Sequence, residues 1–435
     1  MRRSTAALGR PLGRHVGLAV LVVLALLAAA CSGTGHGTSG VRPASEAHSQ
    51  AAAAPKVTIT PANGAGGADP SAGITVTAAG GTLTNVTVRT SGDAVTGQLS
   101  QGGTVWHSRW ALDVSQTYTV TATASRTGSR PVTAVSSFRT VQPDRTFRTE
   151  ILNGYDQAYG VGMPIILYFS QRITDKAAVE RALQVTTSKP VVGSWYWDDP
   201  CNMAATCAYF RPRDYWPSGT KVSFTGHLNG VQGAPGVYGY HTLTQAFSIG
   251  ASVIATGNTA THRTKIYYNG KLRYNWPISS GRPGDETPNG SYLTIEKANP
   301  VEMKGPGYDL LVPWSVRFTY SGDYYHDAYW SVGEQGFDNV SHGCVNLSPA
   351  HAETYYNLAV PGDPVTIAGS PKGGTWGNGW TEWFLSWRQY LKGSALHQAV
   401  QAGPGGSTFV DPSSLPPSTA RAPLQTAPAR NSAAR

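Results

Sequence analysis

One cysteine in the sequence has neighbours that suit nucleophilic chemistry. Cys344 lies in the stretch Ser341–Asn346, which reads Ser-His-Gly-Cys-Val-Asn. A reactive thiol needs a base to remove its proton, donors to stabilise an oxyanion, and a chain bend that exposes the sulfur. Gly343 permits backbone geometry that a larger residue would resist, and it brings two main-chain N–H groups close to an incoming carbonyl. The pattern predicts a nucleophilic cysteine at position 344.

Two histidines are candidates for the base. His342 is a close neighbour of Cys344 in the sequence, but the alternation of side chains along a strand argues against it. His326 ends a strand-like run, and fourteen residues rich in Gly, Asp and Asn separate it from Ser341. Such a loop can return the imidazole to the thiol. The imidazole would then lower the thiol pKa and later carry a proton. We therefore predict His326 as the base, with a purely structural histidine as the alternative.

The other three cysteines are predicted to have different fates. Cys201 and Cys207 lie six residues apart and are expected to form a disulfide in an oxidising compartment. No second pair or nearby histidine set completes a tetrahedral site, so we predict no metal. Cys31 follows an apolar run, Val16–Ala30, which is preceded by arginines. This is typical of a secretion signal and resembles a bacterial lipobox, which predicts lipidation at Cys31; a plainly cleaved signal is the alternative.

Composition favours a β-rich protein outside the cytoplasm. The 435 residues are 14% charged and include 50 glycines and 29 prolines. The net charge of +9 suits a protein that works among anionic polymers, and an ordinary solvated basic surface is the alternative. No cluster of Lys and Arg interleaved with aromatic residues occurs, so nucleic acid is not predicted as a partner.

The chain divides into segments of different character. We predict a signal peptide over 1–31, a flexible linker over 32–55, immunoglobulin-like modules over 56–141 and 142–250, a β-rich third region over 251–370, a Trp-rich subdomain over 371–398 and a disordered tail over 399–435. Trp106 and Trp110 are predicted core residues of the first module. Asp175–Leu183 is predicted to be helical, and Asn269-Gly270 predicts a hairpin turn.

The Trp-rich subdomain carries four tryptophans at intervals of four, three and four residues: Trp376, Trp380, Trp383 and Trp387. This spacing predicts one face of a helix. We expect that face to pack against the third region, with a sugar-binding platform as the alternative.

His326, the fourteen-residue interval and Ser341–Asn346 together resemble the L,D-transpeptidase (YkuD-like) catalytic domain in order and spacing. The resemblance covers roughly residues 251–395 and includes Pro288-Asn289-Gly290, Tyr320-Ser321-Gly322 and Trp330-Ser331-Val332-Gly333. The tandem modules are similar to multi-domain actinobacterial members. The implied fold is mainly β, with two immunoglobulin-like β-sandwich modules, a β-rich catalytic domain and a short Trp-rich helical C-terminal subdomain.

The resemblance also implies roles for individual residues. Cys344 would attack a peptidoglycan stem peptide at the bond between an L-centre and D-alanine, with His326 as base and acid. The main-chain carbonyl of Asp327 would orient the imidazole, and its carboxylate, if it pointed the same way, would raise the imidazole pKa. The N–H groups of Gly343 and Cys344 would form the oxyanion hole, assisted by the Tyr308 hydroxyl.

Further implied contacts complete the expected site. His342 and Asn346 would shape the pocket, Ser321 and Gly322 would contact the donor peptide, and Tyr308, Met303 and Trp330 would be lid or wall residues. The expected partners are tetrapeptide donors, diamino-acid acceptors, carbapenems as covalent inhibitors, and the membrane through a lipid anchor, facing the cell wall. No cofactor is expected.

Other classes of protein fit the sequence less well. Papain-like wall peptidases place Cys before His, whereas here His326 precedes Cys344. Sortases need an arginine soon after the cysteine, and the next one here is Arg388. A non-catalytic lipoprotein with a buried thiol is the remaining alternative.

Overall fold

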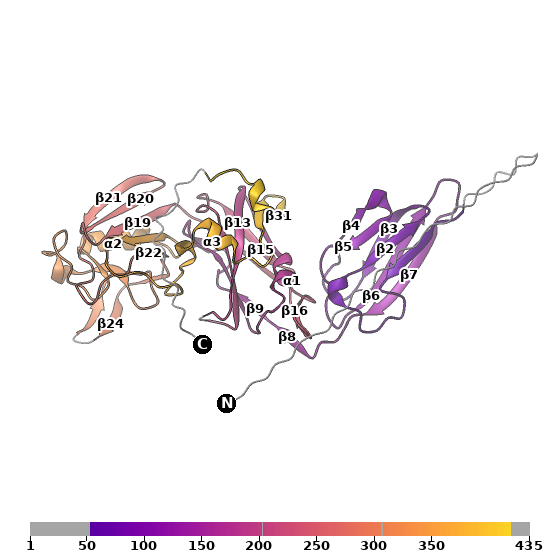
Figure 1. The fold of residues 1–435 in the computed structure, drawn as a ribbon, viewed down its shortest axis with the longest axis horizontal. Coiled ribbons are helices and arrows are strands. Elements are labelled where there is room, and N and C mark those ends of the chain that lie inside the picture. The colour runs from indigo at the N-terminus through magenta and orange to yellow at the C-terminus, as the bar shows by residue number, and fades with distance from the viewer. Residues whose placement is uncertain (1–52, 202, 306–307, 419–435) are drawn as a thin grey trace, which may run out of the picture. The chain divides into compact units, whose positions relative to one another are not determined.

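The computed structural model describes residues 53–201, 203–305 and 308–418 (Figure 1). This part of the chain consists mainly of strands, with three α-helices, α1 (Lys176–Arg181), α2 (Pro349–Leu358) and α3 (Trp387–Leu391). The predicted mainly β fold is therefore confirmed. The predicted signal segment and Cys31 lie outside the described residues. Within those residues, no helix combines the length and the apolar character needed to cross a membrane.

Two antiparallel sheets form the first module. One has the order β1-β2-β5-β4 and the other β3-β6-β7. Their bounds are β1 Lys56–Thr60, β2 Thr75–Ala79, β3 Thr82–Arg89, β4 Gly97–Ser100, β5 Val105–Ser108, β6 Thr117–Ser125 and β7 Val132–Arg139. Every second residue of β6 from Tyr118 to Ala124 is buried, as expected for a strand with one face on a core. Trp106 belongs to this core, as predicted, but Trp110 is half-buried and lies outside it.

The second module is built from three sheets, with the orders β10-β18-β15-β12, β31-β30-β13-β14-β11-β9 and β16-β17-β8. The bounds are β8 Arg145–Phe147, β9 Thr149–Ile151, β10 Ala158–Tyr159, β11 Ile165–Phe169, β12 Leu183–Thr187, β13 Val191–Asp198, β14 Thr206–Pro212, β15 Lys221–Gly226, β16 Gln232–Ala234, β17 Val237–Gly239 and β18 Leu243–Ile249. The predicted helix is α1, and Asp175 caps its N-terminus by accepting from the Ala178 amide.

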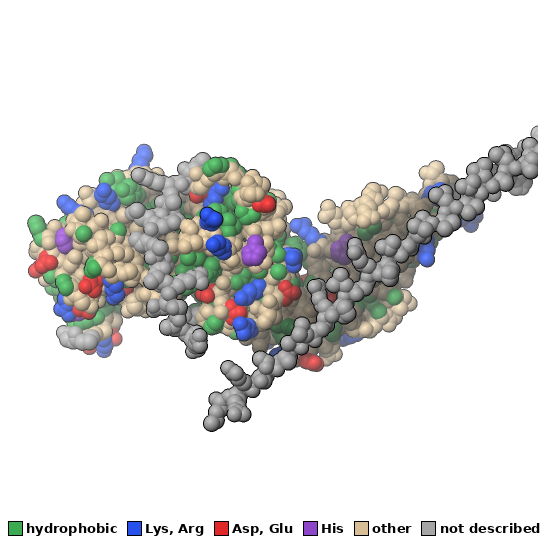
Figure 2. Space-filling view, viewed as in Figure 1, with side chains coloured by type: hydrophobic (Ala, Val, Ile, Leu, Met, Phe, Trp, Pro, Cys, Tyr) green, Lys and Arg blue, Asp and Glu red, His purple; other side chains and the backbone are tan. Residues whose placement is uncertain are grey.

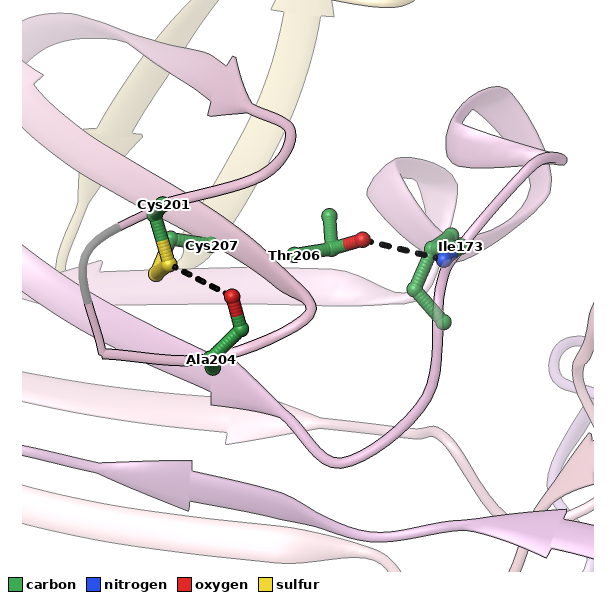
Figure 3. Close-up of a disulfide and its surroundings, with 5 residues drawn as sticks. All are labelled: Ile173, Cys201, Ala204, Thr206 and Cys207. Carbon is green, nitrogen blue, oxygen red and sulfur yellow. Dashed lines mark hydrogen bonds between the residues drawn. A yellow bond between two sulfur atoms is a disulfide. The ribbon is translucent and has the colours of Figure 1, made fainter.

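A disulfide joins Cys201, in the loop between β13 and β14, to Cys207 within β14 (Figure 3). Thr206, next to Cys207, accepts a hydrogen bond from the Ile173 amide at 3.1 Å. The small loop closed by the disulfide is therefore fixed to the segment that leads into α1.

The C-terminal segment corrects one prediction. Instead of being disordered from residue 399, the chain forms β30 (Ala399–Gly403) and β31 (Gly406–Val410), and β30 pairs with β13 of the second module. Val400 and Ala402 are buried there in the module's core. The composition of the whole tail obscured a local signal, because short apolar runs flank the turn residues Pro404 and Gly405.

The tryptophans also differ from the prediction, because they do not share one continuous helix. Gly377 and Gly379 have φ values of +79° and +115°, which no right-handed helix contains. A 3-10 helix, η4 (Glu382–Phe384), and α3 follow this turn. Trp380 and Trp383 are core residues, in a cluster that includes residues of the second module as well as Leu293 of the third region. A shared helical face is excluded. Trp380 and Trp383 are packing residues, but they pack mainly against the second module and not, as predicted, mainly against the third region.

The third region holds two main sheets, β21-β20-β19-β29-β22 and β23-β26-β27-β28, and the hairpin β24-β25. The bounds are β19 Val253–Asn258, β20 Arg263–Tyr268, β21 Lys271–Pro277, β22 Gly290–Leu293, β23 Glu296–Ala298, β24 Val301–Gly305, β25 Tyr308–Val312, β26 Ser315–Arg317, β27 Tyr324–Asp327, β28 Val345–Leu347 and β29 Pro364–Ala368. The hairpin predicted at Asn269-Gly270 joins β20 to β21.

Short 3-10 helices also occur elsewhere in the described chain. Besides η4, they are η1 Pro70–Ala72, η2 Gln101–Gly103, η3 Tyr329–Ser331 and η5 Pro412–Ser414.

Charged side chains are interspersed on the face shown in Figure 2, where Lys and Arg lie among Asp and Glu instead of forming one basic patch. On this face, the distribution agrees with an ordinary solvated surface more than with a dedicated polyanion groove.

Candidate active site

A parallel strand pair brings the predicted base and the predicted nucleophile's strand together. β27 pairs with β28 so that Tyr325 lies beside Val345 and His326 lies beside Asn346. Tyr325 and Val345 are fully buried in the hydrophobic core. Because neighbouring residues of a strand face opposite sides, His326 and Asn346 face away from that core.

This face borders a pocket of about 300 Å³. Seven of the predicted site residues line it: Cys344, His326, His342, Asn346, Tyr308, Met303 and Trp330. They come from the hairpin β24-β25, from β27 with η3, and from β28 with the loop that leads into it. The pocket therefore unites segments that span more than forty residues of sequence. Four other predicted residues do not line it: Asp327, Gly343, Ser321 and Gly322.

The loop before β28 has the bend that a reactive cysteine requires. Gly343 has φ +126°, a conformation that residues with a side chain rarely adopt. The Ser341 hydroxyl donates to the Cys344 carbonyl at 2.6 Å and accepts from the Gly343 amide at 3.2 Å. The expected use of the Gly343 N–H in the oxyanion hole is thus not met in this structure, because a local side-chain turn engages that amide.

Thr287 is a functional candidate that the sequence analysis missed. Its buried hydroxyl donates to the Gly343 carbonyl at 2.6 Å and accepts from the Gly281 amide at 2.9 Å. It therefore ties the cysteine loop to a neighbouring loop. The available signal was its position directly before the Pro288-Asn289-Gly290 motif.

His326 is 3% exposed, and its Nδ1 lies 2.7 Å from the main-chain carbonyl of Asp327. A carbonyl only accepts, so Nδ1 carries the proton and Nε2 is left with its lone pair. Burial lowers the pKa of His326 to about 4 and outweighs the hydrogen bond to Asp327, which acts in the opposite direction. The imidazole is therefore neutral near pH 7 and able to accept a proton.

The carboxylate of Asp327 does not lie in the pocket that the His326 imidazole lines. Asp327 is buried, its Oδ1 has no hydrogen-bond partner among the described residues, and it does not line the pocket. Burial raises its own pKa. The main-chain carbonyl of Asp327 orients the base, and its side chain is not a cause of the shifted His326 pKa.

Cys344 is half-buried, and its thiol lies 3.6 Å from the Gly322 carbonyl. Burial, followed by the negative charge of Asp323, raises the pKa of the thiol to about 12, against a hydrogen bond from the Tyr324 main chain. The resting pair is therefore a neutral thiol and a neutral imidazole. A proton must move from sulfur to nitrogen during the reaction.

His342 lies at the pocket and not on the far side of a strand. It is two residues before Cys344, and β28 begins only at Val345, so strand alternation does not apply across the turn at Gly343. Its ring centroid is 4.9 Å from that of Tyr308, whose hydroxyl pKa is raised mainly by burial. This contact connects the hairpin β24-β25 to the cysteine loop.

The remaining predicted residues have defined contacts. Asn346 donates to the Ser331 hydroxyl at 2.8 Å, and its Oδ1 has no partner among the described residues. Trp330 is 44% exposed, with its ring 6.0 Å from that of His326. Ser321 is held by Asn378, through a bond from its amide at 2.8 Å and a bond to its hydroxyl at 2.9 Å.

One pocket is thus lined by an unpaired thiol and an imidazole, and comparisons with known proteins identify the class of protein. Residues 65–232 match the model of a bacterial Ig domain, and residues 252–367 match that of the L,D-transpeptidase catalytic domain. The chain is 32% identical over 406 residues to L,D-transpeptidase 2 of Mycobacterium tuberculosis, covering 90% of this chain and 98% of the relative. It is 34% identical over 352 residues to L,D-transpeptidase 5 of the same species, covering 79% and 78%.

A solved structure of an L,D-transpeptidase in complex with imipenem is 32% identical and covers 52% of this chain and 100% of that chain, with a TM-score of 0.43. The match to L,D-transpeptidase 2 extends over nearly the full length of both proteins. The chain belongs to the L,D-transpeptidases, a family of enzymes that crosslink peptidoglycan, and the predicted family, fold class and enzyme class are confirmed.

Proposed function

We propose that this enzyme joins peptidoglycan stem peptides through a thioester on Cys344, with His326 as the proton carrier and with release of D-alanine. One observation carries the proposal: a single pocket is lined by the unpaired thiol and by an imidazole whose Nδ1 is engaged, which leaves Nε2 for the thiol proton. Removal of a proton by a positioned base is worth about 10²–10⁴ in rate.

The first step forms the acyl-enzyme. The thiol proton passes to Nε2 of His326 while Sγ attacks the carbonyl that precedes D-alanine. The tetrahedral intermediate then collapses, the C–N bond to D-alanine breaks, and the imidazolium returns the proton to the leaving amine. The amide of Cys344 and the hydroxyl of Tyr308 are the donors that we assign to the oxyanion, because the Gly343 amide is engaged by Ser341.

The second step transfers the acyl group. The side-chain amine of an acceptor's diamino acid attacks the thioester, an amide forms, and the thiol is regenerated. Thioesters suit this step because amines attack them readily, whereas water does so slowly. Ser321 and Gly322 are proposed contacts of the donor peptide, while Met303 and Trp330 are proposed pocket walls.

We also propose that carbapenems acylate Cys344. The solved relative with imipenem supports this, because a strained lactam carbonyl meets the same nucleophile and base as the peptide carbonyl. The pocket, which carries apolar residues such as Leu310 and Val312 beside the polar pair, has the mixed lining expected for a small-molecule site.

The site of action follows from the N-terminal sequence. We propose that the enzyme is exported, lipidated on Cys31 and anchored to the membrane facing the cell wall, since the wall is where the polymer occurs. The two immunoglobulin-like modules are then spacers that carry the catalytic domain from the membrane towards its polymer.

The proposal is tested with purified protein lacking residues 1–31 and a disaccharide-tetrapeptide substrate. Crosslinked dimer and free D-alanine, both absent for Cys344→Ala, are the expected products. Tripeptide without dimer would instead show a carboxypeptidase, and dimer formation by Cys344→Ala would contradict the assignment of the nucleophile.

A further inference from the structure

A buried carboxylate beside the cysteine loop has no part in the chemistry above. Asp323 is 8% exposed. None of the ion pairs found among the described residues includes it. A carboxylate withdrawn from water without a cation costs free energy, and such groups gather at functional sites.

Hydrogen bonds hold one oxygen of this carboxylate and leave the other facing the loop. Oδ2 accepts from the Thr319 hydroxyl at 2.6 Å and from the Ser321 hydroxyl at 3.1 Å. Oδ1 points to Gly343, where a Cβ atom would lie only 2.5 Å from it. The carboxylate is therefore fixed in place, with its second oxygen against the residue that precedes Cys344.

The same turn contacts the sulfur. Asp323 follows Gly322, whose carbonyl lies 3.6 Å from Cys344 Sγ. A Cβ built on Gly322 would meet nothing within 4 Å, so the space beside this residue is open. Neither Gly322 nor Asp323 lines the pocket that holds His326 and Tyr308. The thiol is thus flanked on one side by that pocket and on another by the turn that carries the Gly322 carbonyl and the Asp323 carboxylate.

A negative charge at this place opposes formation of the thiolate, so it does not assist the first step. It would attract a cation. Resting on the function proposed above, we infer that Asp323 binds the ammonium group of the acceptor and takes its proton before the amine attacks the thioester. The Gly322 carbonyl, free of the thiol once the sulfur is acylated, would be a second acceptor for the same group.

The proton balance of this step is closed. The carboxylate and the ammonium ion become a carboxylic acid and an amine, an exchange that a buried site favours because two neutral groups replace two charged ones. The amine nitrogen bonds to the thioester carbon, the C–S bond breaks, and the nitrogen's surplus proton passes through His326 to the sulfur. Asp323 then releases its own proton to solvent as the product leaves.

The test compares Asp323→Asn with Asp285→Asn. The first variant keeps the shape and the acceptor for Thr319 and Ser321 while removing the charge. Asp285 is an acid on a neighbouring loop that is paired with Arg282 at 2.9 Å, so the second variant is a matched charge control. Two quantities are measured for each: the rate of imipenem acylation by intact mass, and the ratio of crosslinked dimer to hydrolysed tripeptide.

For Asp323→Asn we expect acylation within about threefold of the wild type and a dimer-to-tripeptide ratio that falls roughly a hundredfold, the size of a lost general base. Hydroxylamine, which is uncharged at neutral pH, should resolve the acyl-enzyme of the variant as fast as that of the wild type. Asp285→Asn should change neither quantity.

Three results would overturn the inference: an unchanged ratio, a parallel fall in acylation and ratio, or an equal loss with hydroxylamine. The last two would show that Asp323 only supports the loop. A wild-type protein that forms no acyl-enzyme would instead contradict the proposed function itself, so the two failures are distinguishable.

Discussion

The imidazole of His326 is positioned by the main-chain carbonyl of Asp327, 2.7 Å from Nδ1, and not by the Asp327 carboxylate. Any residue at position 327 supplies the same carbonyl. The charge that distinguishes this side chain therefore has no direct part in orienting the base, although it lies on the very next residue.

Asp327→Asn should consequently leave the rate of acylation by imipenem within about threefold of the wild-type rate. The corresponding change in activation free energy is smaller than the contribution of a typical hydrogen bond. The measurement is the second-order rate of adduct formation at neutral pH. His326→Ala is the comparison, expected to lose a hundredfold or more. A loss of similar size in Asp327→Asn would mean that the carboxylate takes part.

The pH dependence follows from the pKa shifts of the neutral pair. Burial lowers the pKa of His326 to about 4, so the base is lost by protonation only as the pH falls towards that value. Acylation by imipenem should therefore stay nearly constant between about pH 5 and pH 8. An inflection at about pH 6.5 would indicate an ordinary imidazole pKa instead.

Direct alkylation measures the protonation state of the Cys344 thiol independently of the base. Because burial raises the pKa of Cys344 to about 12, thiolate is scarce at neutral pH. Its alkylation by iodoacetamide should rise about tenfold per pH unit across the neutral range. A rate that has already reached its plateau at neutral pH would contradict a protonated resting thiol.

Thr287 gives a test of the loop that carries the cysteine. Thr287→Val removes a hydroxyl that serves both Gly343 and Gly281, leaving two buried main-chain groups without a partner. Each such group costs about 1–3 kcal/mol, so the free energy of unfolding should fall by at least that much, and acylation should slow. Thr287→Ser keeps the hydroxyl and should behave like the wild type. If Thr287→Val and Thr287→Ser had the same unfolding free energy and acylation rate, the hydroxyl would have no role in holding the cysteine loop.

The hairpin β30-β31 gives a test of the corrected C-terminal boundary. A chain ending at Gln398 exposes the core that Val400 and Ala402 cover, and it removes the Ser407 hydroxyl that accepts from the Val185 amide at 3.1 Å. We expect its free energy of unfolding to fall by about 3 kcal/mol or more relative to a chain ending at Ser418. Equal denaturation midpoints would show that the hairpin adds no stability.

Local sequence patterns predicted much of this molecule, and the failures share a cause. The Asn269-Gly270 turn and the helix after Asp175 depend on neighbours in sequence, and both were predicted correctly. The tryptophan spacing was misleading because glycines interrupt it, and the tail was missed because β30 gains its stability from a strand some two hundred residues earlier.

The site shows the same division. Cys344 and His326 line one pocket, and both could be predicted as site residues because their spacing is a local motif. The partners that fix their surroundings were not found, because Thr287 and Asp323 reach the cysteine loop only through the fold. A residue that acts on a carbonyl or a charge across a turn leaves no periodic signal in the sequence.

The most direct test of the account is the covalent state of Cys344 after incubation with imipenem. Intact-mass spectrometry of the wild type should show one adduct, and peptide mapping should place it on the peptide that contains Cys344. Cys344→Ala should show none. No adduct on the wild type, or an adduct that persists in Cys344→Ala, would contradict the assignment of Cys344 as the nucleophile.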